Sequence, residues 1–191
     1  MTTRQKRKLA GLLTALIIAG FTMLGNYFGW LNEPVALLGQ HDPGTYKVVR
    51  FSDGDTITVD MNGKHETVRM IGVDTPETHH PDRPVQCYGP AASAYTKNLI
   101  GNQKVRLEAD PTNQNRDRYG RLLRYVYLPD GRLVQAEIIK SGHGFAYTSF
   151  PFTKKEEFVK LEEQAKSENK GLWGNCTVTE ENGYKSTNPA E

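Results

Sequence analysis

Three short runs of alternating apolar and polar residues follow one another between Tyr46 and Val73. The runs are YKVVRF, DTITVDM and ETVRMIGV, and each has the length and the period-two pattern of a β-strand. Asn62-Gly63 lies between the second and third runs, and these residues readily adopt the positive φ angles of a tight type I′ hairpin. The chain is therefore restricted to folds whose globular part begins with a hairpin and one further strand.

Two more strands and three helices are expected downstream. KVRLEA and RLLRYVYL are strand candidates. Gly89-Pro90 opens a helical run that ends before Gly101, a shorter run ends before Gly142, and the longest runs from Lys154 to Lys170 before Gly171. This order favours an α+β fold, in which a five-stranded β-barrel of the OB-fold type carries about three α-helices.

The domain boundaries follow from the same pattern. The globular domain is expected over residues 45–176, after a linker at 31–44 that mixes Pro, Gly and polar residues. Residues 177–191 have no apolar periodicity and are predicted to be a disordered tail.

The N-terminus resembles a membrane-targeting segment. A basic flank at 1–8 precedes an uncharged apolar segment at 9–30, which is long enough as a helix to cross the roughly 30 Å of a bilayer core. Tyr27, Phe28 and Trp30 fall where an interfacial aromatic belt belongs, and the leading cations favour a cytoplasmic N-terminus. We expect a single-pass transmembrane signal anchor with the domain outside the cytoplasm. A cleaved signal peptide is the alternative, and the domain would then be secreted.

Only Cys87 and Cys176 occur, so the spacing of a zinc site is absent. In an oxidising compartment the two thiols could form a disulfide, and two unpaired thiols are the alternative.

The net charge of +2 hides an asymmetry. The first forty residues carry four basic side chains against Glu33, so the remainder, with 20 basic and 21 acidic side chains, has a net charge of −1. This is not the basic footprint of a typical nucleic-acid-binding domain, so any such partner has to be argued from local groups.

Two acidic clusters lie at strand ends. Asp53-Gly54-Asp55-Thr56 precedes one strand, and Asp74-Thr75-Pro76-Glu77 follows another. Carboxylate and carbonyl oxygens in such positions suit a hard cation. Each cluster taken alone is also a common turn or helix start.

Two arginines strengthen the functional interpretation. Arg69 lies within an apolar alternating strand, where a charge needs a partner or a function, and Arg121 follows a polar turn that leads into another strand. Two fixed guanidinium groups beside carboxylates that bind a cation are a suitable set for phosphoryl transfer.

The ordered motifs DGDT, RMIGVDTPET, YGPAASAYTK and DRYGR, followed by Ala-Tyr before a long helix ending in Gly-Leu-Trp, resemble the staphylococcal nuclease family. The resemblance covers Tyr46 to Trp173. It implies an OB-type barrel with three helices and a thermonuclease-type endonuclease, a hydrolase that cuts DNA and RNA. Water would attack phosphorus and leave a 3′-phosphate. Single-stranded or locally unpaired substrates and a monomeric enzyme are expected.

The resemblance also implies a role for individual residues. Ca²⁺ would bind the carboxylates of Asp55 and Asp74 and the backbone carbonyl of Thr75, with Asp53 beside them. Glu77 would be the general base, and both arginines would bind the scissile phosphate. The implied catalytic set is Arg69, Glu77 and Arg121, and the implied substrate contacts are Arg118, Tyr119 and Tyr147.

The chain departs from the family pattern in two respects. Its domain is nearly neutral where well-known secreted members are distinctly basic, so weaker non-specific binding is expected. The second tyrosine usual downstream of Tyr147 is replaced within Ala-Tyr-Thr-Ser-Phe.

Two rival functions use the same fold. The first is a catalytically silent OB-type module that binds nucleic acid or protein. The second is a calcium-dependent adhesion or signalling domain, which leaves Arg69 and Arg121 without a function.

Overall fold

The computed structural model describes residues 44–78 and 84–190. The predicted basic flank, the membrane segment and all but the last residue of the linker lie outside these residues. In the part of the chain that is described, no helix combines the length and the apolar character needed to cross a membrane.

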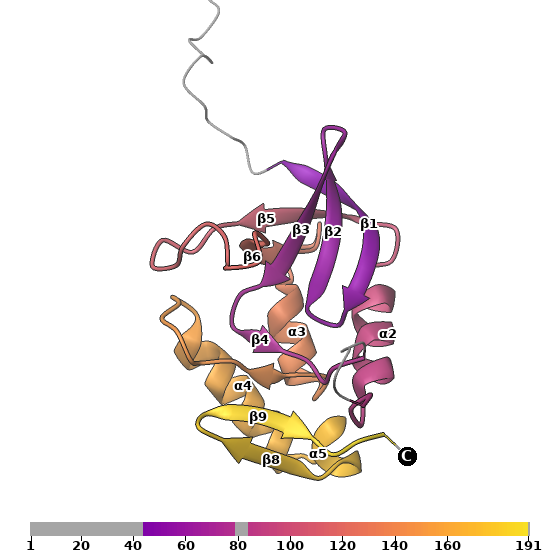
Figure 1. Ribbon diagram of the computed structural model, residues 1–191, viewed down its shortest axis with the longest axis vertical. Helices are drawn as coiled ribbons and strands as arrows, with labels where there is room; N and C mark the ends of the chain where they lie inside the picture. Colours follow the sequence, from indigo (N-terminus) through magenta and orange to yellow (C-terminus); the bar gives the residue numbers. More distant parts are fainter. Residues whose placement is uncertain (1–43, 79–83, 191) are drawn as a thin grey trace, which may run out of the picture. The chain divides into compact units, whose positions relative to one another are not determined.

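Five strands close into a barrel in the order β1-β2-β3-β6-β5, with β5 paired to β1 (Figure 1). β3 and β6 run parallel, and the other pairs are antiparallel. The strands are β1 Thr45–Asp53, β2 Thr56–Met61, β3 Lys64–Met70, β5 Lys104–Glu108 and β6 Leu122–Tyr127. The prediction of an α+β fold built on a five-stranded barrel is confirmed.

The turn between β2 and β3 has the predicted conformation. Asn62 and Gly63 have φ angles of 57° and 88°, as a type I′ turn requires. Met61 pairs with Lys64 across it, so the register of both strands is set at this point.

Three helices accompany the barrel, as predicted: α2 Gly89–Ile100, α3 Val134–Lys140 and α4 Lys155–Ser167. A single further turn, α5 Leu172–Asn175, follows them. α4 ends earlier than Lys170 because Asn169 adopts a left-handed φ of 49°. A two-stranded ladder joins β4 Val73–Asp74 to β7 Phe145–Ala146 beside α3 and α4 (Figure 1).

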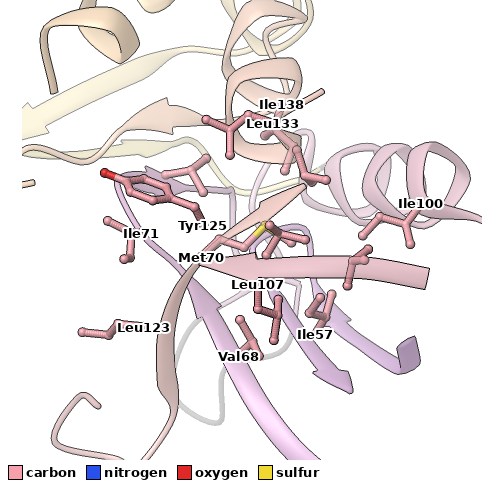
Figure 2. Close-up of a cluster of buried hydrophobic side chains, with 14 of the residues drawn as sticks. Ile57, Val68, Met70, Ile71, Ile100, Leu107, Leu123, Tyr125, Leu133 and Ile138 are labelled. Carbon is pink, nitrogen blue, oxygen red and sulfur yellow. The ribbon is translucent and has the colours of Figure 1, made fainter. Parts of the chain in front are cut away.

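The core fills the barrel and continues under the helices. Ile57, Val68 and Met70 contribute from β2 and β3, and Ile138 of α3 packs against the same cluster (Figure 2). These side chains are almost fully buried, so the strand ends that carry the candidate residues stand on a rigid base.

The predicted disordered tail is wrong, because residues 177–190 are ordered. β8 Val178–Glu181 and β9 Tyr184–Thr187 form an antiparallel hairpin, hereafter the C-terminal hairpin. Its turn is Asn182-Gly183, with φ angles of 53° and 77°. This is the turn chemistry of Asn62-Gly63 again, but the exposed strands beside it lack the apolar alternation used to recognise strands.

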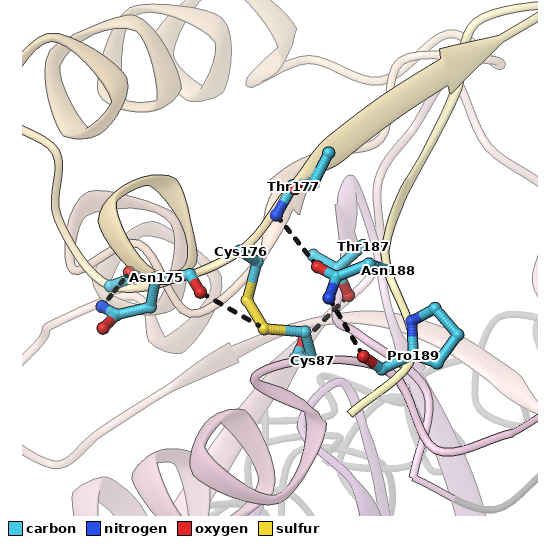
Figure 3. Close-up of a disulfide and its surroundings, with 8 residues drawn as sticks. Cys87, Asn175, Cys176, Thr177, Thr187, Asn188 and Pro189 are labelled. Atoms are coloured by element: carbon cyan, nitrogen blue, oxygen red, sulfur yellow. Dashed lines mark hydrogen bonds between the residues drawn. A yellow bond between two sulfur atoms is a disulfide. The ribbon is translucent and has the colours of Figure 1, made fainter. Parts of the chain in front are cut away.

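A disulfide joins Cys87 to Cys176 at the base of this hairpin (Figure 3). The N–H of Cys87 donates to the carbonyl of Asn188 at 2.7 Å, and the hydroxyl of Thr187 donates to the carbonyl of Cys87 at 2.8 Å. The segment before α2 and the end of the chain are thus held together by one covalent bond and a short backbone pairing.

Removing the disulfide is expected to destabilise the protein. The bond spans 89 residues of chain, and a loop of this size contributes up to about 4–5 kcal/mol in the chain-entropy model. We expect the Cys87→Ser/Cys176→Ser variant to lose several kcal/mol of unfolding free energy in urea titrations. Reduced wild type is the control and should approach the double variant. Equal stability of all three forms would contradict this expectation.

Candidate functional site

One open cleft of about 470 Å³, hereafter the cleft, gathers most of the predicted site residues. The end of β3, the loop before β6 and the loop after β7 all contribute to it. It is lined by Arg69, Asp74, Arg118, Tyr119, Arg121 and Tyr147, together with neighbours from the same loops. Arg69 and Tyr147, which are 78 positions apart in the chain, therefore share one space.

Arg69 is the most enclosed of the candidate cations, since its side chain is 15% exposed. It lies on β3 and forms ion pairs with both Asp55 and Asp74, and its Nη2 atom is 2.5 Å from Oδ1 of Asp74. A charge in this position requires such partners, because an unpaired buried cation is strongly destabilising. The two predicted metal-binding carboxylates therefore converge on one guanidinium.

Asp55 connects the start of β2 to the end of β4. Its Oδ2 atom accepts hydrogen bonds from the N–H and the hydroxyl of Thr75 at 2.9 and 3.0 Å. Its Oδ1 atom accepts one from the hydroxyl of Thr56 at 2.8 Å. Asp55 and Thr75 are both buried, so these charge-assisted bonds fix the relative position of the two acidic clusters.

Glu77 lies on the segment after β4, and it is not among the residues that line the cleft. Its backbone is held from both sides by Gln86: Oε1 of Gln86 accepts the Glu77 N–H at 2.7 Å, and the Gln86 N–H donates to the Glu77 carbonyl at 2.9 Å. Gln86 directly precedes the disulfide residue Cys87. The neighbouring Thr78 hydroxyl donates to the carboxylate of Asp53. Asp53 thus supports the segment that carries Glu77.

Arg121 is oriented by Asp117, a residue to which the sequence had assigned no role. The Nε atom of Arg121 donates to Oδ2 of Asp117 at 2.6 Å, and Oδ1 of Asp117 accepts the N–H groups of Tyr119 and Arg121. Burial alone would raise the pKa of Asp117, but the hydrogen bonds from Arg121 and from the loop backbone hold that pKa below its usual value. The spacing of four residues did not predict this pair, because that rule applies to a helix face and residues 117–121 form a turn.

The turn before Arg121 presents an aromatic ring to solvent. Tyr119 is 68% exposed. The guanidinium carbons of Arg118 and Arg121 lie 4.8 and 5.3 Å from the centre of its ring, within the range of cation–π contacts. The predicted substrate contacts Arg118 and Tyr119 therefore stand at the rim of the cleft beside a catalytic candidate.

Tyr147 directly follows β7 and is the last of the predicted cleft residues along the sequence. Its N–H donates to the carbonyl of Gly72 at 2.9 Å, and its ring packs edge-on against Phe150, with 5.3 Å between the ring centres. The structure thus places Tyr147 in the cleft with Arg69 and Arg121.

A buried carboxylate, Asp110, ties together the two loops that form the cleft walls. It is 3% exposed. Its Oδ2 atom accepts hydrogen bonds from the hydroxyl of Tyr125 and from the N–H and hydroxyl of Thr153, each at 2.7 Å. Its Oδ1 atom accepts two more from Thr112. Asp110 therefore links the start of the loop that carries Tyr119 to the segment that follows Tyr147.

Stability should depend on the ionisation of Asp110. Burial alone would raise its pKa, but the hydrogen bonds from Thr112, Thr153 and Tyr125 together hold that pKa well below its usual range. Because the folded state prefers the ionised form, its contribution is complete above the unfolded pKa of about 4 and is lost as the pH falls further.

We expect Asp110→Asn to lower the unfolding free energy by about 1.5–3 kcal/mol at pH 7, and the difference from wild type to shrink below about pH 4. Urea titrations across this range measure it. Glu163→Gln, an exposed carboxylate on α4, is the control and should change little. A difference independent of pH would contradict the assignment of the effect to ionisation.

The candidate metal ligands have the chemistry of a hard-cation site. The carboxylates of Asp55 and Asp74 converge on Arg69, and the N–H of Thr75 donates to Asp55. Carboxylate and carbonyl oxygens are the ligands that suit Ca²⁺. Within residues 44–78 and 84–190, no group of three or more His, Cys, Asp and Glu side chains is arranged to hold a metal. A Ca²⁺ ion, which takes six to eight ligands, would need water or substrate oxygens to complete its shell.

Comparison with known proteins identifies the family to which the chain belongs. The family described as "Staphylococcal nuclease homologue" matches residues 67–175. The chain is 42% identical to the thermonuclease of Staphylococcus hyicus over 173 residues, which is 89% of this chain and 99% of that protein. It is 46% identical to the thermonuclease of Staphylococcus intermedius over 124 residues, covering 65% of this chain and 70% of that one.

The endonuclease YncB of Bacillus subtilis is 44% identical over 137 residues, covering 71% of this chain and 64% of that protein. The chain belongs to the staphylococcal nuclease family, and by homology it is a hydrolase of the thermonuclease type.

One residue of the cleft comes from a segment that sequence reasoning had discarded. Tyr184, the first residue of β9, lines the cleft together with Arg69 and Arg121. The available signal was Asn182-Gly183 immediately before it, which marks a hairpin and so an ordered position for this tyrosine.

Proposed function

We propose that this protein is a Ca²⁺-dependent nuclease that hydrolyses phosphodiester bonds of DNA and RNA. The observation that carries the proposal is the presence of two arginines, Arg69 and Arg121, in one open cleft with the carboxylate of Asp74. Aromatic side chains at the rim of the same cleft suit nucleosides. The five-stranded barrel beneath it fits the OB class, in which one face binds oligonucleotides.

In this proposal Asp55, Asp74 and the carbonyl of Thr75 hold the cation. A bound Ca²⁺ would supply positive charge beside the phosphate and lower the pKa of bound water. Support comes from the convergence of both carboxylates on one guanidinium, Arg69, which brings an oxygen of each within reach of the same group.

The arginines bind the phosphate and stabilise the charge that builds up on its oxygens during attack. In the described part of the chain, Arg121 is held through its Nε atom, so its two terminal nitrogens remain to donate to phosphate oxygens. Asp117 therefore orients the guanidinium of Arg121 and leaves the two terminal nitrogens for the substrate.

Glu77 orders the attacking water and accepts its proton as the oxygen attacks phosphorus. The bond to the 5′-oxygen breaks, that oxygen leaves with the electron pair and takes up a proton, and a 3′-phosphate remains. The two hydrogen bonds to Gln86 fix the backbone of Glu77, from which its carboxylate would have to extend towards the cleft.

We further propose that the domain acts outside the cytoplasm, attached by the segment at 9–30 or released after its cleavage. The disulfide between Cys87 and Cys176 supports export, since such bonds persist in oxidising compartments. Fractionation of cells, with and without protease treatment of the outer face, distinguishes the anchored from the secreted form.

Nuclease activity is tested by digesting single-stranded DNA and RNA with the full chain, in Ca²⁺ and in chelator. We expect activity only with Ca²⁺. Glu77→Gln should lower kcat by about 10²–10⁴-fold, as is typical of a lost general base. Arg121→Lys should lower kcat by about 10²–10³-fold, because a lysine cannot donate the paired hydrogen bonds of a planar guanidinium.

The matched controls are Glu163→Gln and Arg132→Lys, which make the same substitutions at exposed positions away from the cleft. Binding without cleavage in all conditions would favour the silent OB-type module instead. Undiminished cleavage by Glu77→Gln would leave the nuclease but remove Glu77 as its base.

The cation site has its own test, which does not depend on activity. Ca²⁺ at about one hundred times its dissociation constant should stabilise the folded protein by about 2.7 kcal/mol, seen as a rise in Tm. Asp55→Asn should abolish most of the rise, whereas the exposed Asp130→Asn should retain it. The same Ca²⁺-induced rise in Asp55→Asn as in wild type would exclude Asp55 as a ligand.

A further inference from the structure

The C-terminal hairpin contributes one side chain to the cleft. Of residues 178–187, only Tyr184 lines it, in company with Arg69, Asp74 and Arg121. Its side chain is 40% exposed, one of four large apolar or aromatic residues with this degree of exposure in the described chain. An aromatic face is therefore presented to the space in which a phosphodiester would lie.

Tyr184 is held in place from two directions. Its partner across the hairpin is Glu181, next to the tight turn at Asn182-Gly183. The following residue, Lys185, forms an ion pair with Glu162 of α4 at 2.6 Å, and β9 runs beside α4 in Figure 1. Glu162 is buried, so this contact anchors the strand to the domain.

The same buried carboxylate reaches the other aromatic wall of the cleft. Oε1 of Glu162 accepts the N–H of Ala146 at 3.0 Å, and Tyr147 is the next residue. Glu162 thus fixes Tyr184 and Tyr147 relative to one another through one residue on each side. At the far end of the hairpin, Thr187 and Asn188 are secured to Cys87 (Figure 3). The backbone at Tyr184 is therefore held in place before any ligand binds.

We propose that Tyr184 is a substrate-binding residue that stacks on an unpaired base of a single-stranded nucleic acid, at a nucleotide flanking the scissile phosphate. The inference rests on the proposed nuclease function and extends it. Tyrosine faces bind bases of any identity by stacking, and this contact requires a base that is not already stacked within a duplex. The residue therefore favours single strands without selecting their sequence.

The effect of removing the ring should depend on the substrate. Stacking on one base corresponds to about a five- to 150-fold change in dissociation constant. We expect Tyr184→Ala to weaken binding of an oligothymidylate of about ten nucleotides at least about fivefold. An abasic deoxyribose-phosphate strand of the same length, which offers no base for stacking, should bind equally to both proteins.

The experiment measures binding of labelled oligothymidylate and of the labelled abasic strand to the full chain by fluorescence anisotropy, and KM and kcat for cleavage of the oligothymidylate. Tyr184→Phe keeps the ring and should bind like wild type, whereas Tyr184→Leu should resemble Tyr184→Ala. Thr179→Ala, an exposed substitution on β8, controls for loosening of the hairpin. The loss should appear in KM with little change in kcat.

The outcomes separate this inference from the function on which it rests. Wild-type cleavage with unchanged binding and KM in Tyr184→Ala would overturn the role of Tyr184 and leave the nuclease intact. An equal loss in Thr179→Ala, or for the abasic strand, would also overturn it, because the effect would then not arise from stacking. Binding without cleavage, still dependent on the ring at position 184, would reject the nuclease and retain the stacking site. Neither binding nor cleavage by wild type would reject both.

Discussion

The pairing of Arg69 with Asp55 and Asp74 is the interaction on which the rest of the site depends. It sets a cation from the end of β3 between carboxylates from two different strand ends, and the hydrogen bonds that Asp55 accepts from Thr75 complete the connection. A low-dielectric environment makes each of these contacts strong and makes the loss of either partner costly. The barrel therefore cannot rearrange here without exposing an unpaired charge, and this rigidity is what a preorganised phosphate site needs.

The second constraint comes from the end of the chain. Gln86 holds the backbone of Glu77, Cys87 follows Gln86 directly, and the disulfide, Thr187 and Asn188 hold Cys87. The segment that carries the proposed base is thus supported by residues about one hundred positions later. The same C-terminal segment places Tyr184 in the cleft. A part of the chain outside the region matched to the family, which ends at residue 175, takes part in the site on both of these counts.

The sequence predicts those parts of the molecule in which local chemistry determines structure. Asn62-Gly63 defines a hairpin by its positive φ angles, and Gly101 ends a helix, so these elements were found. Asn182-Gly183 carries the same information, but the strands beside it are exposed and gain their order from Lys185, Glu162 and the disulfide. Such long-range contacts leave no periodic pattern.

The pairing of Arg121 with Asp117 was similarly missed, since a turn such as DRYGR does not indicate which side chain folds back. The roles of Glu77, Arg69 and the metal ligands remain predictions from the resemblance.

The charge balance of the cleft explains how a nearly neutral domain can address a polyanion. Both arginines of the catalytic set already have carboxylate partners: Arg69 has Asp55 and Asp74, and Arg121 has Asp117. A phosphate that enters the cleft therefore competes for guanidinium groups that are paired, so the net electrostatic gain is smaller than bare cations would provide. Long-range attraction is weak as well, because the domain has little net charge.

Affinity for nucleic acid must then come from short-range contacts that do not depend on charge. Aromatic faces at Tyr119, Tyr147 and Tyr184 supply such contacts, and they do so only for bases that are free to leave the stack.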